Sequence, residues 1–187
     1  VVDLQTVITS LGDQKVVLYG QCFGGPAAIA YTAAHPERVE RLILDGTYAD
    51  GRNIAPPERQ KRILGTLRDL PEAGLAFMSN MTHPNPAPTK FRSSYLRDGW
   101  LYKENALQLY KLGFRVNVTA LLPRIHTPTL VLHRIGTRAI PFRLGRALAS
   151  SINGARFVAL EGQAHNAWDE HPRVALDAVG EFLGVRF

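Results

Sequence analysis

Hydrophobic positions follow two spacings along this chain, and their order predicts helices and strands in succession. Apolar residues three or four apart before Gly12 predict an amphipathic helix over 1–11. Short β-branched runs bounded by turn residues predict buried strands at 15–19, 41–44, 129–133 and 155–160. Helical patterns are found at 27–35, 141–150 and 172–183. Strands that alternate with helices predict an α/β fold with a mostly parallel sheet.

Residues 51–118 depart from this alternation. They hold helical patterns broken by prolines, and the stretch MTHPNPAP at 81–88 is predicted to be irregular. We therefore expect one domain over 1–187, in which a helical segment at 51–118 is inserted between two βα halves.

Composition narrows the class of protein. The 187 residues are 45% hydrophobic and 20% charged, which is typical of a soluble globular domain. No apolar run is long enough to span a membrane and no secretory leader opens the sequence, so we expect a cytoplasmic protein without a membrane partner. The net charge of +6 is scattered and not interleaved with aromatic residues, so nucleic-acid binding is not expected.

The single cysteine excludes an intrachain disulfide and a Cys-rich metal site. The sequence also contains neither a phosphate-binding loop nor a ligand-spaced cluster, so no metal and no cofactor are expected.

The turn at 20–24 (GQCFG) fits the pattern Gly-x-nucleophile-x-Gly between a predicted strand and a predicted helix. A nucleophile on such a turn adopts strained backbone geometry and needs small neighbours two residues before and after it. We expect the following helix to lower the pKa of the Cys22 thiol. The backbone N–H of Phe23 is the candidate oxyanion donor. The alternative is that Cys22 is a buried, inert thiol.

Two longer stretches resemble the α/β-hydrolase family. Residues 18–46 (LYGQCFGGPAAIAYTAAHPERVERLILDG) resemble its nucleophile elbow, the helix after it and the next strand. Residues 123–168, which end in EGQAHNAW, resemble its last two strands and catalytic-histidine loop. The resemblance implies that Cys22 stands where the family usually has serine, that His165 is the general base, and that 51–118 form a helical cap.

The sequence departs from that family where the catalytic acid is expected. The position holds Thr137, which carries no carboxylate. A variant of related folds places the acid after the family's sixth strand. The predicted strand at 41–44 resembles that strand, so the resemblance then assigns the role of the acid to Asp45. Glu161 and Asp169 are weaker candidates.

The family's first strands and oxyanion loop have no counterpart before Val1. We therefore expect a chain shortened at its N-terminus, with one strand edge exposed. A second copy of the chain or a complementing N-terminal fragment would then cover that edge.

The leading hypothesis is a hydrolase of carboxylic esters, thioesters or lactones that acts on a small-molecule acyl substrate. The predicted substrate contacts are Gln21, Phe77, Met81 and Trp100. An alternative is a ligand-binding or interaction module that has kept the fold and lost turnover. A third alternative is that Cys22 was engineered from a serine in order to trap a substrate.

Overall fold

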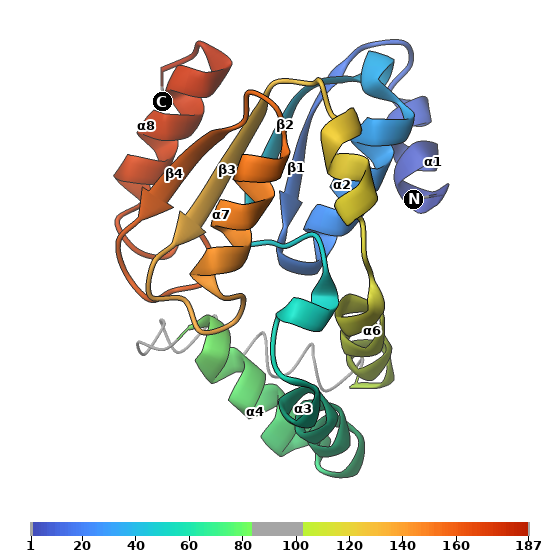
Figure 1. Ribbon diagram of the computed structural model, residues 1–187, viewed down its shortest axis with the longest axis vertical. Coiled ribbons are helices and arrows are strands. Elements are labelled where there is room, and N and C mark those ends of the chain that lie inside the picture. The colour runs from blue at the N-terminus through green and yellow to red at the C-terminus, as the bar shows by residue number, and fades with distance from the viewer. Residues whose placement is uncertain (1, 84–102, 187) are drawn as a thin grey trace.

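The computed structural model describes residues 2–83 and 103–186, and this part of the chain contains a parallel β-sheet (Figure 1). Its strands lie in the order β1-β2-β3-β4, and each pair of neighbours is parallel. The bounds are β1 Val16–Gln21, β2 Val39–Asp45, β3 Thr129–Arg134 and β4 Arg156–Leu160. The predicted α/β class and the four predicted strands are confirmed.

One face of the sheet is covered by α2 (Gly25–Ala34) and α7 (Phe142–Ser151). Ile29 of α2 and Leu148 of α7 are fully buried in one cluster with Leu42, Leu44 and Val131 of the sheet. Each such side chain removed from water contributes about 1.5–3 kcal/mol to folding. This cluster holds the start of α2 against the end of β1, where Cys22 lies.

The opposite face is covered by α8 (Pro172–Leu183), which packs on β3 and β4. Alternate strand residues point to opposite faces, so Leu130 and Leu132 meet Ala175 and Val179 of α8. Helix α1 (Val2–Ser10) contributes its Ile8 to a smaller cluster near β1.

The edge strand β1 keeps apolar side chains in solvent. Val17 is 44% exposed and Tyr19 is 38% exposed. The pairing of this edge with a second copy or an N-terminal fragment stays a prediction.

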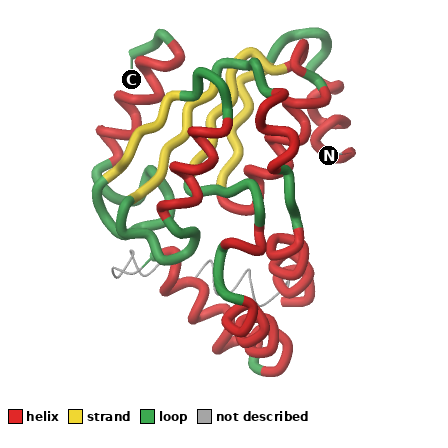
Figure 2. Tube along the Cα trace, viewed as in Figure 1, coloured by secondary structure: helices red, strands yellow, loops and turns green. Residues whose placement is uncertain are grey.

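Between β2 and β3 the chain forms α3 (Pro57–Asp69), α4 (Pro71–Thr82) and α6 (Lys103–Arg115). These inserted helices lie together beyond the carboxyl ends of the strands, next to the loops that leave the sheet (Figures 1 and 2). Helix α4 continues through Met81 and Thr82, so the prediction of irregular structure from residue 81 onward was wrong for these two positions. The role of 51–118 as a substrate cap remains a prediction.

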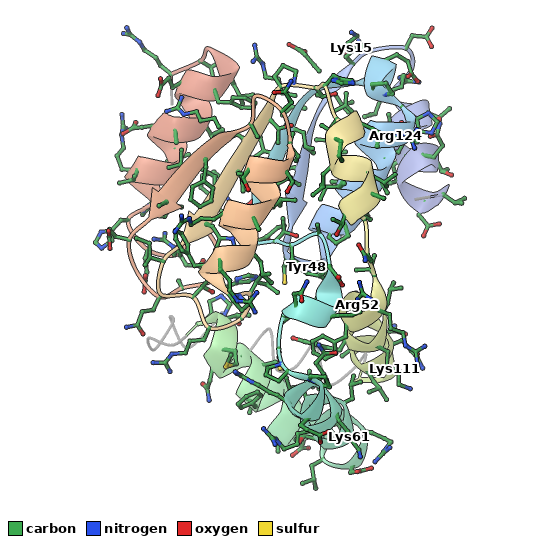
Figure 3. All side chains as sticks on the ribbon, viewed as in Figure 1. Lys15, Tyr48, Arg52, Lys61, Lys111 and Arg124 are labelled. Carbon is green, nitrogen blue, oxygen red and sulfur yellow. The ribbon has the colours of Figure 1, made fainter. Side chains whose placement is uncertain are left out.

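Tyr48 connects the inserted helices to the sheet. It is fully buried, and its hydroxyl donates a hydrogen bond of 2.9 Å to the carbonyl of Gly113 in α6. Figure 3 labels Tyr48 between the ends of the strands and these helices. None of the helices in the described ranges is both long and apolar enough to cross a membrane.

Candidate active site

Cys22 occupies a strained position at the end of β1. It opens a short 3₁₀ turn, Cys22–Gly24, that leads directly into α2, and its φ is +48°. A non-glycine residue in this region costs about 1–3 kcal/mol, so the surrounding structure must hold it there. The hydroxyl of Thr47 does so in part, because it donates a hydrogen bond of 2.6 Å to the Cys22 carbonyl oxygen.

The glycines near this turn differ in whether a side chain would fit in their place. A Cβ on Gly20 would lie 2.7 Å from the Cβ of Ala28, and one on Gly25 would lie 2.0 Å from the Thr47 hydroxyl oxygen. A Cβ on Gly24 would meet nothing within 4 Å. The expected need for a small residue two positions before Cys22 is therefore met at Gly20. The close approach on the other side falls at Gly25 and not at Gly24.

The Cys22 thiol is held in its protonated form. Burial, together with the charge of Asp45, raises its pKa to about 12, although the backbone N–H of Phe23 acts in the opposite direction. The expectation that the helix N-terminus would favour a thiolate was wrong, because the loss of hydration outweighs the favourable backbone contact. Cys22 therefore needs a base when it reacts.

His165 lies in the loop between β4 and α8 and is almost fully buried. Its Nδ1 is 3.3 Å from the hydroxyl oxygen of Thr137, and its backbone N–H donates to the carbonyl of Thr82 at 2.8 Å. Within the described residues its Nε2 has no hydrogen-bond partner. When Nδ1–H donates to Thr137, Nε2 carries the lone pair that a general base needs.

Burial also controls the charge of this histidine. Burial, together with the neighbouring His133 and His83, lowers the pKa of His165 to about 3. His165 is therefore neutral at physiological pH. Within the described residues no hydrogen bond joins the ring of His165 to the thiol of Cys22, so their pairing as base and nucleophile stays a prediction.

The loop that carries His165 is held by Arg134, which ends β3 and is 2% exposed. Its guanidinium donates to the carbonyls of Asn166 at 3.1 Å and Ala167 at 2.8 Å, and also to those of Glu161 and Glu170. A buried cation normally needs a carboxylate or several acceptors, and here backbone carbonyls supply most of them. Arg134 therefore fixes both ends of the loop around His165. Sequence reasoning missed this residue, because an arginine at a strand end carries no signal of the loop it will contact.

A cavity of about 60 Å³ opens next to Cys22. Its walls come from the turn, the inserted helices and the loop after β3, and they are mostly apolar. Phe77 and Met81, two predicted substrate contacts, line it. Trp100, a third, lies outside the described residues.

A family model described as "Alpha/beta hydrolase family" matches residues 1–178. The chain belongs to the alpha/beta hydrolase family. Among curated relatives, a 2-hydroxy-6-oxononadienedioate/2-hydroxy-6-oxononatrienedioate hydrolase of Cupriavidus pinatubonensis is 26% identical, over 97% of this chain and 66% of the relative. A protein of the same name from Klebsiella pneumoniae is 28% identical, over 90% of this chain and 62% of the relative. The chain thus spans slightly less than two thirds of the length of these relatives.

Solved structures show the same alpha/beta hydrolase fold. A bromoperoxidase from Bacillus anthracis superposes with a TM-score of 0.88 at 18% identity, over 97% of this chain and 72% of the other. An esterase from Exiguobacterium antarcticum superposes with a TM-score of 0.85 at 20% identity, over 97% and 71%.

Asp45 occupies a different place in this alpha/beta hydrolase from the one expected of an orienting acid. Its Oδ2 accepts hydrogen bonds from the Tyr19 hydroxyl at 2.6 Å and the Ala167 backbone N–H at 3.1 Å. Burial raises its pKa to about 6, against the effect of these two bonds. The carboxylate therefore anchors the backbone of the histidine loop, while Thr137 contacts the His165 ring. The expected contact between Asp45 and that ring is not among the hydrogen bonds.

Gln21 likewise contacts the histidine loop rather than the cavity. Its amide donates to Asn166 Oδ1 at 2.5 Å, and Gln21 is not part of the cavity wall. Asp169, a weaker candidate acid, accepts from the Asn166 amide at 2.7 Å and lies 3.1 Å from His83 Nε2. In the described ranges of this alpha/beta hydrolase, no group of three or more His, Cys, Asp or Glu residues is placed to hold a metal ion.

Proposed function

We propose that this chain forms the catalytic part of a hydrolase of carboxylic esters, thioesters or lactones, with Cys22 as the nucleophile and His165 as the general base. The observation that carries the proposal is the φ of +48° at Cys22, on a turn between strand and helix. Strain of this kind persists where a fold holds a residue for its function. The names of relatives, which include a 2-hydroxymuconate semialdehyde hydrolase, support a hydrolytic reaction.

The reaction begins from a neutral pair. Nε2 of His165 takes the thiol proton as the Cys22 sulfur attacks the carbonyl carbon. The backbone N–H of Phe23 donates to the oxygen that becomes negative. When the tetrahedral intermediate collapses, the bond to the leaving oxygen or sulfur breaks, and the leaving group takes the proton from His165. The product of this half-reaction is a thioester on Cys22.

The second half-reaction repeats these steps with water. Water gives a proton to Nε2 of His165 and attacks the thioester carbon. The carbon–sulfur bond then breaks, the carboxylic acid leaves, and the sulfur of Cys22 takes the proton back. Atoms and protons balance over the cycle, and the site returns to its neutral form.

Thr137 has a limited part in this mechanism. Its hydroxyl can accept a hydrogen bond from Nδ1–H of His165, but it has no charge to stabilise the imidazolium formed during each step. In a serine protease, replacing the carboxylate at the equivalent place by an amide lowers kcat by about 10⁴. We therefore propose a slow enzyme.

A second candidate is a ligand-binding module that has lost turnover. The raised pKa of Cys22 favours it, as does the lack of a hydrogen bond between the His165 ring and any carboxylate of the described residues. A module of this kind has a cavity and a scaffold but does not form an acyl-enzyme.

The test is the intact mass of the protein after exposure to p-nitrophenyl acetate. The wild type should gain one acetyl group and lose it with time. Cys22→Ala should gain none. His165→Ala should acylate slowly and keep any acetyl group it gains, while His126→Ala, outside the site, should behave like the wild type. Failure of the wild type to acquire an acetyl group would contradict the proposal and favour the binding module.

A further inference from the structure

The charged side chains that line the cavity next to Cys22 are both positive. Arg59 of α3 and Arg138 of the loop after β3 both line it, and the described residues of its wall include neither Asp nor Glu. A mostly apolar pocket with a few placed charges is the usual form of a small-molecule site, and those charges decide which ligand is accepted.

The two arginines have no acidic partner of their own. Within the described residues, Arg52, Arg156 and Arg173 each lie within 2.9 Å of a carboxylate oxygen, whereas Arg59 and Arg138 form no ion pair. Arg59 directs a guanidinium nitrogen to within 3.7 Å of the sulfur of Met81, which also lines the cavity. Both arginines are exposed, and a guanidinium group that forms no ion pair with a described residue is available to a ligand.

A second hollow lies between α3 and α4. Its volume is about 600 Å³, and the two hollows share Arg59, Ile63, Phe77 and Met78 in their walls. The second wall adds Arg62, and none of its described residues is acidic. Arg59 therefore belongs to the walls of both hollows.

We infer that Arg59 and Arg138 form a subsite for a carboxylate, and that the substrate is an ester, thioester or lactone that carries this second, negatively charged group. The inference rests on the proposed function, because it names the substrate class of the same site. The planar guanidinium matches a carboxylate through two parallel hydrogen bonds, and a single-sign pocket concentrates anions. Loss of one charge-assisted contact of this kind lowers affinity by about 10- to 100-fold.

The test compares two esters with the same leaving group and an acyl chain of the same length. They are p-nitrophenyl hydrogen succinate, which is anionic, and p-nitrophenyl butyrate, which is neutral. A third ester, 4-carboxyphenyl butyrate, places the carboxylate on the leaving group, with 4-carbamoylphenyl butyrate as its neutral match. We expect kcat/KM at least tenfold higher for one of the anionic esters than for its neutral match, and that ester tells which end of the substrate faces the arginines.

Arg59→Gln and Arg138→Gln should each lower kcat/KM for the preferred anionic ester at least ten times more than for its neutral match. Arg146→Gln, an exposed position on α7 outside both hollows, should leave both rates within twofold of the wild type. Equal rates on anionic and neutral esters, or equal losses on both in the arginine variants, would overturn the subsite.

A binding measurement separates this inference from the proposed function. Calorimetry should find 4-phenylbutyrate bound at least tenfold more tightly than its uncharged match, 4-phenylbutyramide, with the difference lost in Arg59→Gln and Arg138→Gln. This result supports the subsite even if no ester is hydrolysed, which would count against the hydrolase alone. Equal affinity for the two compounds in the wild type would refute the subsite.

Discussion

Replacing Thr137 by aspartate should raise the pKa of His165. The Thr137 hydroxyl oxygen lies 3.3 Å from Nδ1 of His165, and both side chains are buried. A carboxylate placed about 4 Å from an imidazolium interacts with it by about 4 kcal/mol at an effective dielectric constant near 20. Each pKa unit corresponds to about 1.4 kcal/mol, so the pKa of His165 should rise by about three units.

Thr137→Asp should therefore bring the pKa of His165 from about 3 to about 6. The measurement is a proton NMR titration of the histidine ring signals between pH 2 and pH 9. His165→Ala identifies the resonance that belongs to His165. The deacylation rate of the acetylated enzyme, followed by mass, should increase at least tenfold, because the carboxylate stabilises the imidazolium formed in that step.

Thr137→Asn is the matched control, because it has the shape of aspartate without its charge. It should leave the pKa of His165 low and the deacylation rate no higher than that of the wild type. An unchanged pKa in Thr137→Asp, with the protein still folded by circular dichroism, would mean that position 137 does not orient His165. A rise of equal size in the asparagine variant would refute the electrostatic reasoning.

Three other predictions concern the elbow and the loop. Arg134→Met should lower the free energy of unfolding in urea by about 3–5 kcal/mol, because several buried carbonyls lose their donor, and an unfolding midpoint unchanged from the wild type would contradict this. Gly25→Ala should destabilise by more than 2 kcal/mol through its collision with Thr47, whereas Gly24→Ala, in open space, should change stability by less than about 0.5 kcal/mol; equal effects would show that the close approach is absent. The rate of Cys22 alkylation by iodoacetamide should keep rising above pH 10, because the raised pKa keeps the thiol protonated until then, and a plateau below pH 8 would indicate a stabilised thiolate.

The predicted strands and the turn after the first strand follow from local signals. Runs such as KVVLY and TLVLH carry β-branched residues bounded by turn residues, and they form β1 and β3. Gly20 and Cys22 lie at the spacing that a nucleophile elbow needs, so the strained turn and its small residue could be predicted from the sequence. Contacts within a few residues explain these successes, because the chain itself brings the partners together.

The pKa of Cys22 could not be predicted in this way. The local argument, a helix N-terminus beside a thiol, favours the thiolate, but burial opposes it and depends on residues far along the chain. The hydrogen-bond partners of Asp45 could not be predicted for a related reason. Its place at the end of β2 was predicted, yet its partners, Tyr19 and Ala167, come from the edge strand and from the histidine loop.

The sequence by itself determined which residues form the strands, where the strained turn lies, and that the usual acid position holds Thr137. Only the tertiary structure decided that the Thr137 hydroxyl still reaches His165, that Arg134 holds the loop around it, and that Arg59 and Arg138 line the same cavity. The physical reason is sequence distance. Secondary structure and turns depend on neighbours along the chain. Hydration, charge and hydrogen-bond partners at the site depend on segments that the fold brings together, such as residues 28 and 122 positions apart.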